Sequence, residues 1–344
     1  MSNRHHKYLN NALFFFYALF IFGSTFSIAL AQIALGFALT LFIVVAITAR
    51  HNPFVSSLKC FYVLVGSYVI WLFLTGLIGA TPVRSAFMLR EDWLFCIVPI
   101  GIFLFQDEHS RRRLMLIFAA GVLLMSVYGI IQHFTGIHWL KTHALIPAED
   151  FGFRSQGSFT HRLTYGNYYC VAALSLLGFG LPKGNDLTPP MRVFLILAAI
   201  LAIIATIFSY SRGPILAVIV SLVFAGVIMG RKYLLSLIGA LVVTTVVIGL
   251  SMPGLADRFS GTSTDDIDVE YEGSRLFIWK NSLEIVRNHP LFGVGTGNFQ
   301  IAYASHLDPD VPDFRKHAHA HNDLLNIAAI SGLPGMILFA ALWL

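Results

Sequence analysis

Long apolar runs separated by short polar connections set the pattern of this chain. From residue 12 almost to the C-terminal end, these runs approach or exceed the roughly 20 residues that an α-helix needs to cross a bilayer. The run at 12–49 is too long for one helix and has small and polar residues at 23–27, which favours two helices joined by a tight turn. Further spans are predicted at about 58–80, 86–105, 114–135, 163–181, 192–210, 213–230 and 232–251, with a last one from about residue 323. The pattern predicts an all-α, polytopic membrane helical bundle with about ten spans.

The composition agrees with a membrane protein and argues against several other classes. Hydrophobic residues make up 56% of the chain and charged residues 12%, and the mean hydropathy is +0.73, whereas about a quarter of the residues in a soluble chain are charged. Cys60, Cys96 and Cys170 lie in apolar surroundings, so neither a disulfide framework nor a cysteine metal site is indicated. The net charge of +5 is spread between the apolar runs, which indicates membrane topology and gives no support to nucleic-acid binding. The first apolar run shows no cleavage pattern closing a short h-region, so no cleaved signal peptide is predicted.

Lysine and arginine residues predict the orientation of the spans, because they are enriched in cytoplasmic connections. With a cytoplasmic N-terminus, the inside positions hold Arg4, Lys7, Arg50, Lys59, Arg111, Arg112, Arg113, Lys183, Arg192, Arg231 and Lys232. The opposite short connections hold chiefly Arg84, Arg90, Lys141, Arg154, Arg162 and Arg212. This bias predicts longer outer loops at about 136–162 and 252–322. The chain then divides into nine transmembrane helices at 1–251, a large outer loop at 252–322 and a tenth transmembrane helix at 323–344.

The second outer loop is predicted to contain an amphipathic helix. Apolar and polar residues alternate with helical spacing at 274–289. One face would hold Leu276, Trp279, Leu283 and Val286. This face would lie on the membrane surface or against the bundle. Pro290 ends the helix, and Gly293, Gly295 and Gly297 predict a flexible turn after it.

Two arginines are candidates for binding phosphate. Arg212 follows Tyr210 in a hairpin with almost no loop between two spans. A buried guanidinium at a helix end tends to mark a functional site, while an interfacial, snorkelling arginine is the alternative of equal weight. Its five forked donors suit a phosphate or pyrophosphate better than a lysine would. Arg275 begins the amphipathic helix next to an acidic run at 265–272, and here a solvated arginine beside a solvated loop is the simpler interpretation.

Three alternating histidines close the outer loop. His317, His319 and His321 would point to one side of an extended segment, and with Asp313 or Asp323 they could bind a metal ion. The competing interpretation is a single histidine acting on a sugar hydroxyl, because the unperturbed pKa of imidazole lies nearest neutral pH.

Motifs for nucleotide binding and ion coupling are not evident. The glycine run at 293–297 lacks the Lys-Ser/Thr of a phosphate loop, so energy from ATP is not indicated. The spans also lack the paired acidic and basic residues expected of an ion-coupled pump.

Several of these segments resemble the O-antigen ligase and O-antigen polymerase superfamily. His321-Asn322, nine residues, Gly332, two residues and Gly335 match that family's pattern of His-Asn/Ser/Gln, x9 and Gly-x-x-Gly. The family's arginine-bearing hairpin is similar to Ser211-Arg212-Gly213. Its R-x3-W and P-x2-G-x-G segments are similar to Arg275, Trp279, Pro290, Gly293 and Gly295. The stretch from Gly157-Ser158-Phe159 to Gly166-Asn167 resembles the family motif before the sixth span.

The resemblance implies a GT-C-like membrane fold and a metal-independent, inverting glycosyltransferase that uses no cofactor. The expected location is the bacterial inner membrane, with the active site facing the periplasm. The donor would be a glycan on undecaprenyl pyrophosphate and the acceptor the lipid A core sugar of lipopolysaccharide, with membrane lipids as further partners. Arg212 and Arg275 would neutralise the pyrophosphate, and His321 would orient or deprotonate the acceptor hydroxyl. The expected substrate-binding residues are Asn322, His319, Tyr210 and Trp279.

The chain also departs from the family pattern. Ser331 stands where an acidic residue often precedes the first glycine, and Ile337 stands where Gly, Thr or Tyr often follows the second. The family typically has about twelve spans, whereas this chain stops inside the tenth at Leu344. Either the sequence is truncated or the last helices are dispensable, and truncation is expected because residues 324–344 leave no cytoplasmic tail.

Other functions fit parts of the pattern. An O-antigen polymerase or a protein O-oligosaccharyltransferase would share these motifs, and the acceptor decides between them. Ligation is preferred because the large outer loop comes late and is closed by the His-Asn motif. A transporter or lipid-linked-sugar flippase would also use many apolar helices, but no convincing internal repeat is present. A non-catalytic assembly scaffold would tolerate the combined loss of Arg212, Arg275 and His321.

Overall fold

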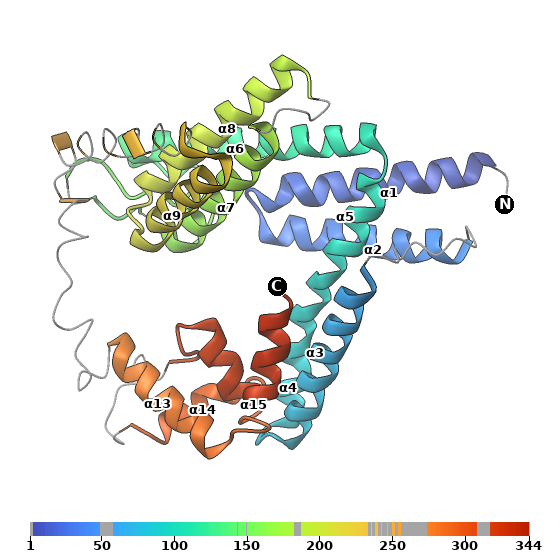
Figure 1. The fold of residues 1–344 in the computed structure, drawn as a ribbon, viewed down its shortest axis with the longest axis vertical. Helices are drawn as coiled ribbons and strands as arrows, with labels where there is room; N and C mark the ends of the chain where they lie inside the picture. Colours follow the sequence, from blue (N-terminus) through green and yellow to red (C-terminus); the bar gives the residue numbers. More distant parts are fainter. Residues whose placement is uncertain are drawn as a thin grey trace. The chain divides into compact units, whose positions relative to one another are not determined.

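The chain folds into two compact helical units (Figure 1), here described from a computed structural model. Its described residues are 3–48, 58–142, 144–148, 150–181, 187–232, 274–307 and 317–343, together with isolated positions between 235 and 255. Unit 1 holds Met1–His51 and Ile100–Gly261, and unit 2 holds Asn52–Pro99 and Thr262–Leu344. Within the described residues, the only β-type pairing is an isolated bridge between Pro147 and Phe153. The all-α prediction is therefore confirmed.

Unit 1 consists mainly of long apolar helices. They are α1 (Asn3–Ser24), α2 (Ile28–Thr48), most of α5 (Ile97–Phe105), α6 (Glu108–Thr135), α7 (Arg162–Gly180), α8 (Pro189–Phe208) and α9 (Arg212–Met229). The predicted break in the first apolar run is confirmed, because the backbone N–H groups of Phe26 and Ser27 donate to the carbonyl of Gly23 and close a tight turn between α1 and α2. A carboxylate begins α6: the N-cap Asp107 accepts a hydrogen bond from the backbone N–H of Ser110 at 2.8 Å.

Small side chains let the helices of unit 1 pack closely. The face of α8 that packs on α6 and α7 is rich in fully buried alanines, namely Ala198, Ala199, Ala202 and Ala205. Small residues bring helix backbones close together, and in a membrane van der Waals packing of this kind drives helix association. Tyr165 and Tyr169 of α7 fill the remaining space, with ring centroids 4.5 Å apart.

Unit 2 joins helices from two distant parts of the sequence. They are α3 (Lys59–Ile78), α4 (Pro82–Met88), the 3-10 helix η2 (Leu89–Cys96), α13 (Arg275–Asn288), α14 (Phe299–Ala304) and α15 (Asp323–Ala341). The span predicted at 86–105 is not a single helix, because α4, η2 and α5 divide it. Charged residues at 90–92 would be costly inside one apolar span, and Pro99 is accommodated in the first turn of α5.

Six helices among the described residues are long and apolar enough to cross a membrane. They are α2, α3, α6, α8, α9 and α15. The predicted span at 232–251 lies largely outside the described residues. A polytopic membrane protein is therefore confirmed, whereas the predicted count of ten spans is not.

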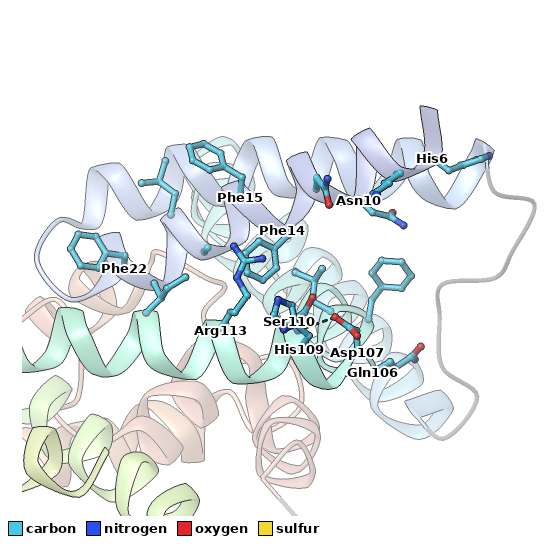
Figure 2. A pocket seen from close by; sticks show the side chains of 17 residues that line it. His6, Asn10, Phe14, Phe15, Phe22, Gln106, Asp107, His109, Ser110 and Arg113 are labelled. Carbon is cyan, nitrogen blue, oxygen red and sulfur yellow. Dashed lines mark hydrogen bonds between the residues drawn. The ribbon is translucent and has the colours of Figure 1, made fainter. Parts of the chain in front are cut away.

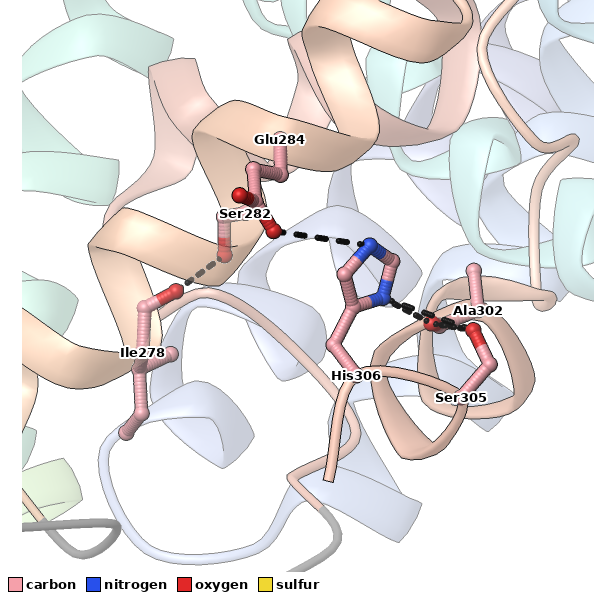
Figure 3. A network of polar contacts seen from close by, with 6 residues as sticks. All are labelled: Ile278, Ser282, Glu284, Ala302, Ser305 and His306. Atoms are coloured by element: carbon pink, nitrogen blue, oxygen red, sulfur yellow. Dashed lines mark hydrogen bonds and ion pairs between the residues drawn. The ribbon is translucent and has the colours of Figure 1, made fainter. Parts of the chain in front are cut away.

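Polar contacts connect α13 with α14 (Figure 3). His306 follows α14, and its Nε2 lies 3.9 Å from Oε2 of Glu284 on α13. The other ring nitrogen, Nδ1, lies 2.8 Å from the carbonyl oxygen of Ala302. Ile278 and Ile285 of α13 belong to one apolar cluster with residues of α14 and α15. The three helices therefore share one core.

The buried face of α13 differs from the predicted one. The buried residues are Ile278, Asn281, Ser282 and Ile285. Leu283, which was predicted on the apolar face, is 49% exposed. The reason is that α14 and α15 cover the side of α13 that contains Ile278.

Candidate active site

Residues 317–321, here called the histidine loop, lead directly into α15 of unit 2. Asn322 is the N-cap of this helix, and its Oδ1 accepts from the backbone N–H of Leu325 at 3.1 Å. One turn later, Oδ1 of Asn326 accepts from the backbone N–H of Ala320 at 3.2 Å. Ala320 is fully buried in the core shared by α13, α14 and α15. The loop is thus held at Ala320, while His321 remains exposed.

The backbone turns sharply at His321. Its φ is 51°, in the left-handed region that non-glycine residues rarely adopt. Its backbone N–H donates to Nδ1 of His319 at 3.2 Å, and the centroids of these two rings are 4.2 Å apart. The ring of His317 lies 5.3 Å from that of His321 and 5.9 Å from that of Tyr303 on α14. The segment is therefore not extended as considered from the sequence, and the turn gathers the three rings into a cluster.

Arg275 occupies the first position of α13, directly after the N-cap Ser274. Oγ of Ser274 accepts from the backbone N–H of Phe277 at 3.0 Å. Backbone N–H groups give a helix start partial positive charge, and the exposed guanidinium of Arg275 adds a full charge there. Trp279 lies one turn further along, and its buried Nε1 has no hydrogen-bond partner among the described residues. The start of α13 therefore offers both charge and N–H donors to an anion.

Partial burial and positive neighbours lower the pKa of His321 to about 4. Burial is the main cause, because it disfavours the charged imidazolium, and the charges of His319, His317 and Arg275 follow. The pKa of His317 is also lowered, first by burial and then by His319. Both shifts favour the neutral imidazole at pH 7. Arg275 is close enough to His321 for its charge to act on the imidazole.

The two glycine motifs of the sequence meet at a kink in α15. Gly332 has φ 73° and ψ 178°, which interrupts the helix. A Cβ at Gly332 would collide with the carbonyl of Leu291, and one at Gly293, whose φ is 63°, would collide with the backbone of Ile330. Glycine is needed at both positions for its positive φ and for this close approach. The packing explains why the His-x10-Gly-x-x-Gly and P-x2-G-x-G segments occur in one chain.

Carbonyls released by the kink find new donors. Pro334 has no N–H to offer the carbonyl of Ile330, and an unsatisfied carbonyl is costly in apolar surroundings. The replacement donors are Gly295 N–H to Ile330, Val294 N–H to Ala329 and the Trp71 indole N–H to Ser331, at 2.9, 2.9 and 2.8 Å. These bonds fix the kink, and with it the direction in which α15 runs from the histidine loop.

Arg212 lies in unit 1, at the first position of α9. Ser209, Tyr210 and Ser211 alone separate α8 from α9, so the predicted short hairpin is confirmed. Tyr210 is fully buried and has φ 52°. In the described part of the chain, the two non-glycine residues with positive φ are Tyr210 and His321. Such strain persists only where the surrounding structure enforces it, and it clusters at functional sites.

Contacts on several sides enforce the conformation of Tyr210. Its hydroxyl donates to Oδ2 of Asp150 at 3.2 Å, and its backbone carbonyl accepts from Nη1 of Arg162 at 2.9 Å. Asp150 also accepts from the backbone N–H of Leu255 at 3.0 Å. The ring of His133 lies 6.1 Å from that of Tyr210. Sequence reasoning missed Asp150 and His133, because no local pattern connects them with the hairpin.

The motif at 157–167 packs beside the same hairpin. Gly166 of α7 approaches so closely that a Cβ would lie 2.7 Å from Oγ of Ser209. Gly157, with φ 58°, is held by Gln132 of α6, which accepts from its N–H and donates to its carbonyl, both at 2.8 Å. This motif therefore fixes α6 and α7 around the start of α9.

The candidate residues fall into two groups. In unit 2, Arg275, His319, His321 and Asn322 gather where α13 and α15 begin, with Trp279 one turn further along α13. The second group, Tyr210 and Arg212, belongs to unit 1.

The histidine cluster bears on the metal-site alternative. Within the residues that the structure describes, no three His, Cys, Asp or Glu side chains are arranged to hold a metal ion. Asp313, one of the carboxylates considered for such a site, lies outside the described residues, as does the acidic run at 265–272.

The comparison with protein families gives one match. Residues 197–340 match a family model described as O-antigen ligase. Comparisons with curated proteins and with solved structures gave no match. The matched segment contains Arg212, Arg275 and His321. With the membrane-crossing helices, it supports a glycosyltransferase-like activity of the ligase or polymerase type on lipid-linked glycans in a bacterial membrane. The family match thus relates residues 197–340 of this chain to the O-antigen ligase and polymerase superfamily.

Proposed function

We propose that this protein is an O-antigen ligase that transfers a glycan from undecaprenyl pyrophosphate to the lipid A core sugar, on the periplasmic side of the inner membrane. The observation that carries the proposal is the charged start of α13 beside the neutral histidine before α15, within the segment that matches the family. An anion-binding group then lies beside a hydrogen-bond acceptor. Transfer from a pyrophosphate donor to a hydroxyl requires both.

The arginines are proposed to bind the leaving group. Negative charge on the pyrophosphate grows in the transition state, so a preorganised cation stabilises the transition state more than the ground state. Arg275 would act together with the backbone N–H groups of the first turn of α13. For Arg212 the support is its family motif and its place at the first position of α9. No metal ion is required by this scheme, because the cations are side chains.

His321 is proposed to act on the acceptor hydroxyl. The hydroxyl oxygen forms a bond to the anomeric carbon, the bond from that carbon to the pyrophosphate oxygen breaks, and the electron pair leaves with undecaprenyl pyrophosphate. The hydroxyl proton passes to His321. Attack opposite the leaving group inverts the anomeric configuration.

Because the pKa of His321 is lowered, we propose that the donor binds before His321 accepts the proton. An imidazole with a pKa of about 4 is a weak base in the free protein. A bound pyrophosphate would offset the positive charge of Arg275 and raise the pKa of His321 toward neutrality. His321 would therefore become an effective base when the donor is in place, which limits loss of the donor to water.

The remaining candidates would orient the substrates. His319 and Asn322 adjoin His321, and we propose that they contact the acceptor sugar. Trp279 has an unpartnered indole N–H in the described structure and an aromatic face suited to a sugar ring. Tyr210 is fully buried, so we propose that it positions Arg212 and does not itself contact the substrate.

A reconstituted transfer reaction tests the proposal. The purified protein is mixed with a lipid-linked donor and, separately, with lipid A core, a second lipid-linked glycan or an acceptor protein, and the product is identified by its mass. Product on lipid A core supports ligation, whereas product on one of the other acceptors indicates a polymerase or a protein oligosaccharyltransferase.

His321→Ala is the matching variant. It is expected to lower transfer by about 10³-fold, within the range of general acid–base catalysis. His289→Ala is the control, because this exposed histidine follows α13 in the same unit. Equal transfer by both variants, with equal insertion into the membrane, would rule out the role of His321.

A further inference from the structure

A cavity of about 1140 Å³ opens between α1, α6 and the end of α5 in unit 1 (Figure 2). Its volume is that of a site for a large ligand. None of the residues proposed for glycan transfer lines it. The chemistry of its wall changes along its length, from polar groups near the start of α1 and α6 to aromatic and aliphatic groups further along both helices.

Basic and amide groups form the polar end of the cavity. Lys7, Asn10 and Asn11 come from α1, and His109 and Arg113 come from α6. The one carboxylate of the lining, Asp107, already accepts from the first turn of α6 as its N-cap. Exposed Lys7 and Arg113 therefore outnumber this carboxylate and give this end a net positive charge.

Arg113 marks the boundary between the two ends. Its guanidinium carbon lies 4.5 Å from the centroid of the Phe14 ring, within cation–π range. The preceding residue, Arg112, pairs instead with Glu108. The charge of Arg113 is thus held over an aromatic ring in the wall of the cavity, as Figure 2 shows.

The apolar end continues for two further turns of α1. Its lining consists of Phe15, Ala18, Leu19 and Phe22 of α1 with Ile117 of α6, while Phe103 and Leu104 of α5 line the cavity next to Gln106 and Asp107. Phe15 is 60% exposed, which is costly in water but favourable next to an acyl chain. Polar groups at one end and apolar groups at the other match the structure of a lipid.

We propose that this cavity binds an anionic phospholipid, with its phosphate at Lys7 and Arg113 and an acyl chain along Phe14, Phe15 and Phe22. A free phosphate would leave the apolar end unused, and an uncharged lipid would leave two cations without a counter-charge. The Lys and Arg distribution of the chain predicts that this end faces the cytoplasm, so the lipid belongs to the inner leaflet.

Native mass spectrometry of the purified full chain tests this proposal. Phosphatidylglycerol, the corresponding diacylglycerol and soluble glycerophosphate are added separately. Wild-type protein is expected to retain phosphatidylglycerol and to lose the other two. Equal retention of diacylglycerol, or displacement of phosphatidylglycerol by glycerophosphate, would overturn the proposal without any variant.

Two variants locate the binding. Lys7→Gln with Arg113→Gln is expected to lower retention about 30-fold, since each basic residue near a membrane surface contributes roughly fivefold. The matched control is Arg111→Gln with Arg112→Gln, which removes two charges from α6, the helix of Arg113, but outside the cavity lining. Leu19→Trp, which fills the apolar end, is expected to lower retention without a change in charge. Unchanged retention in both cavity variants would show that the lipid binds elsewhere and refute the proposal.

Discussion

Arg212 and Arg275 occupy equivalent local positions but are supported in different ways. Each is the first residue of a helix and follows a serine at the N-cap. Near Arg212, the strained residue is the fully buried Tyr210, which is hydrogen-bonded through both its hydroxyl and its backbone carbonyl. Near Arg275, the strained residue is the exposed His321, on a loop held by its neighbour Ala320.

This difference fits the separate roles proposed for the two arginines. A buried polar network holds Tyr210, two residues before Arg212, and a backbone fixed in this way would suit an anchor for phosphate. The exposed histidine of unit 2 is available to a substrate and has a pKa that a bound anion would raise. In the proposed reaction, backbone strain of the same kind would support charge placement in unit 1 and proton transfer in unit 2.

Gly332→Ala tests whether glycine packing supports the histidine loop, and it should have the largest effect. The new Cβ meets the carbonyl of Leu291 at a positive φ, so we expect a loss of stability of about 3 kcal/mol or more. The fall in the midpoint of thermal unfolding in detergent measures it. Gly66→Ala in α3 of the same unit is the control, because a Cβ there meets nothing within 4 Å.

The proposed support of the histidine loop by the packing at Gly332 would be wrong if both glycine variants behaved like wild type. A stable Gly332→Ala protein with full transfer would mean that the kink is not needed to hold His321. Unit 2 would then require another support for its histidine.

The sequence predicted the helices of unit 1 better than those of unit 2. Long apolar runs specify α2, α6, α8 and α9 almost directly, because a span in a membrane must satisfy its own backbone groups. The division into α4, η2 and α5 escaped this reasoning, since apolar length alone does not show where a charged stretch interrupts a helix. Likewise, the buried face of α13 depends on α14, a helix of six residues without a periodic signal of its own.

For the candidate site, the motifs indicated the residues themselves but not the contacts that hold them in position. His321, Arg275 and the glycines were evident from their spacing. The turn at His321 was not, because positive φ in a histidine is enforced by contacts distant in sequence. Asp150 was missed for the same reason, as its partner Tyr210 lies 60 positions later.

Lysine substitutions compare the two arginines directly. Arg275→Lys keeps the charge but loses the fork of N–H donors, and we expect turnover to fall about 100-fold, the lower range for loss of one transition-state donor. Arg212→Lys is expected to cost about tenfold, because a fixed anchor retains part of its effect as a point charge. Turnover at saturating lipid-linked donor provides the measurement.

Each arginine has a control near the far end of its helix. Arg287→Lys lies at the exposed end of α13, and Arg231→Lys lies just beyond α9, and both should transfer at the wild-type rate. Wild-type turnover in Arg212→Lys and Arg275→Lys would show that two-pronged recognition of pyrophosphate is wrong at both positions.

The pH dependence of transfer reports on the coupling between Arg275 and His321. The pKa of His321 is about 4, below the usual value near 6.5, so the reactive neutral form persists as pH falls through 6 and is lost near pH 4. Activity measured as kcat/KM should therefore stay level between pH 7 and 5. In Arg275→Gln one positive neighbour is removed, the pKa of His321 rises, and the acid limb moves to higher pH.

Titration of the substrates affects the wild-type protein and every variant equally, so it does not contribute to the difference between their pH profiles. Arg287→Gln should leave the acid limb in place. A limb near pH 6.5 in the wild-type protein, or an unmoved limb in Arg275→Gln, would contradict the electrostatic coupling of these two residues.

Asp150→Asn tests the hydrogen bonds around Tyr210 in unit 1 and should have the smallest effect. The amide retains one oxygen acceptor but loses the charge, so stability should fall by about 1–2 kcal/mol, with only a few-fold loss of transfer. Tyr210→Phe removes the hydroxyl that donates to Asp150. If the two side chains act as one unit, the double variant is destabilised by less than the sum of the single variants. Additive losses in thermal unfolding would mean that Asp150 acts through its bond to the backbone of Leu255, and that Tyr210 is positioned by Arg162 and the ring of His133 instead.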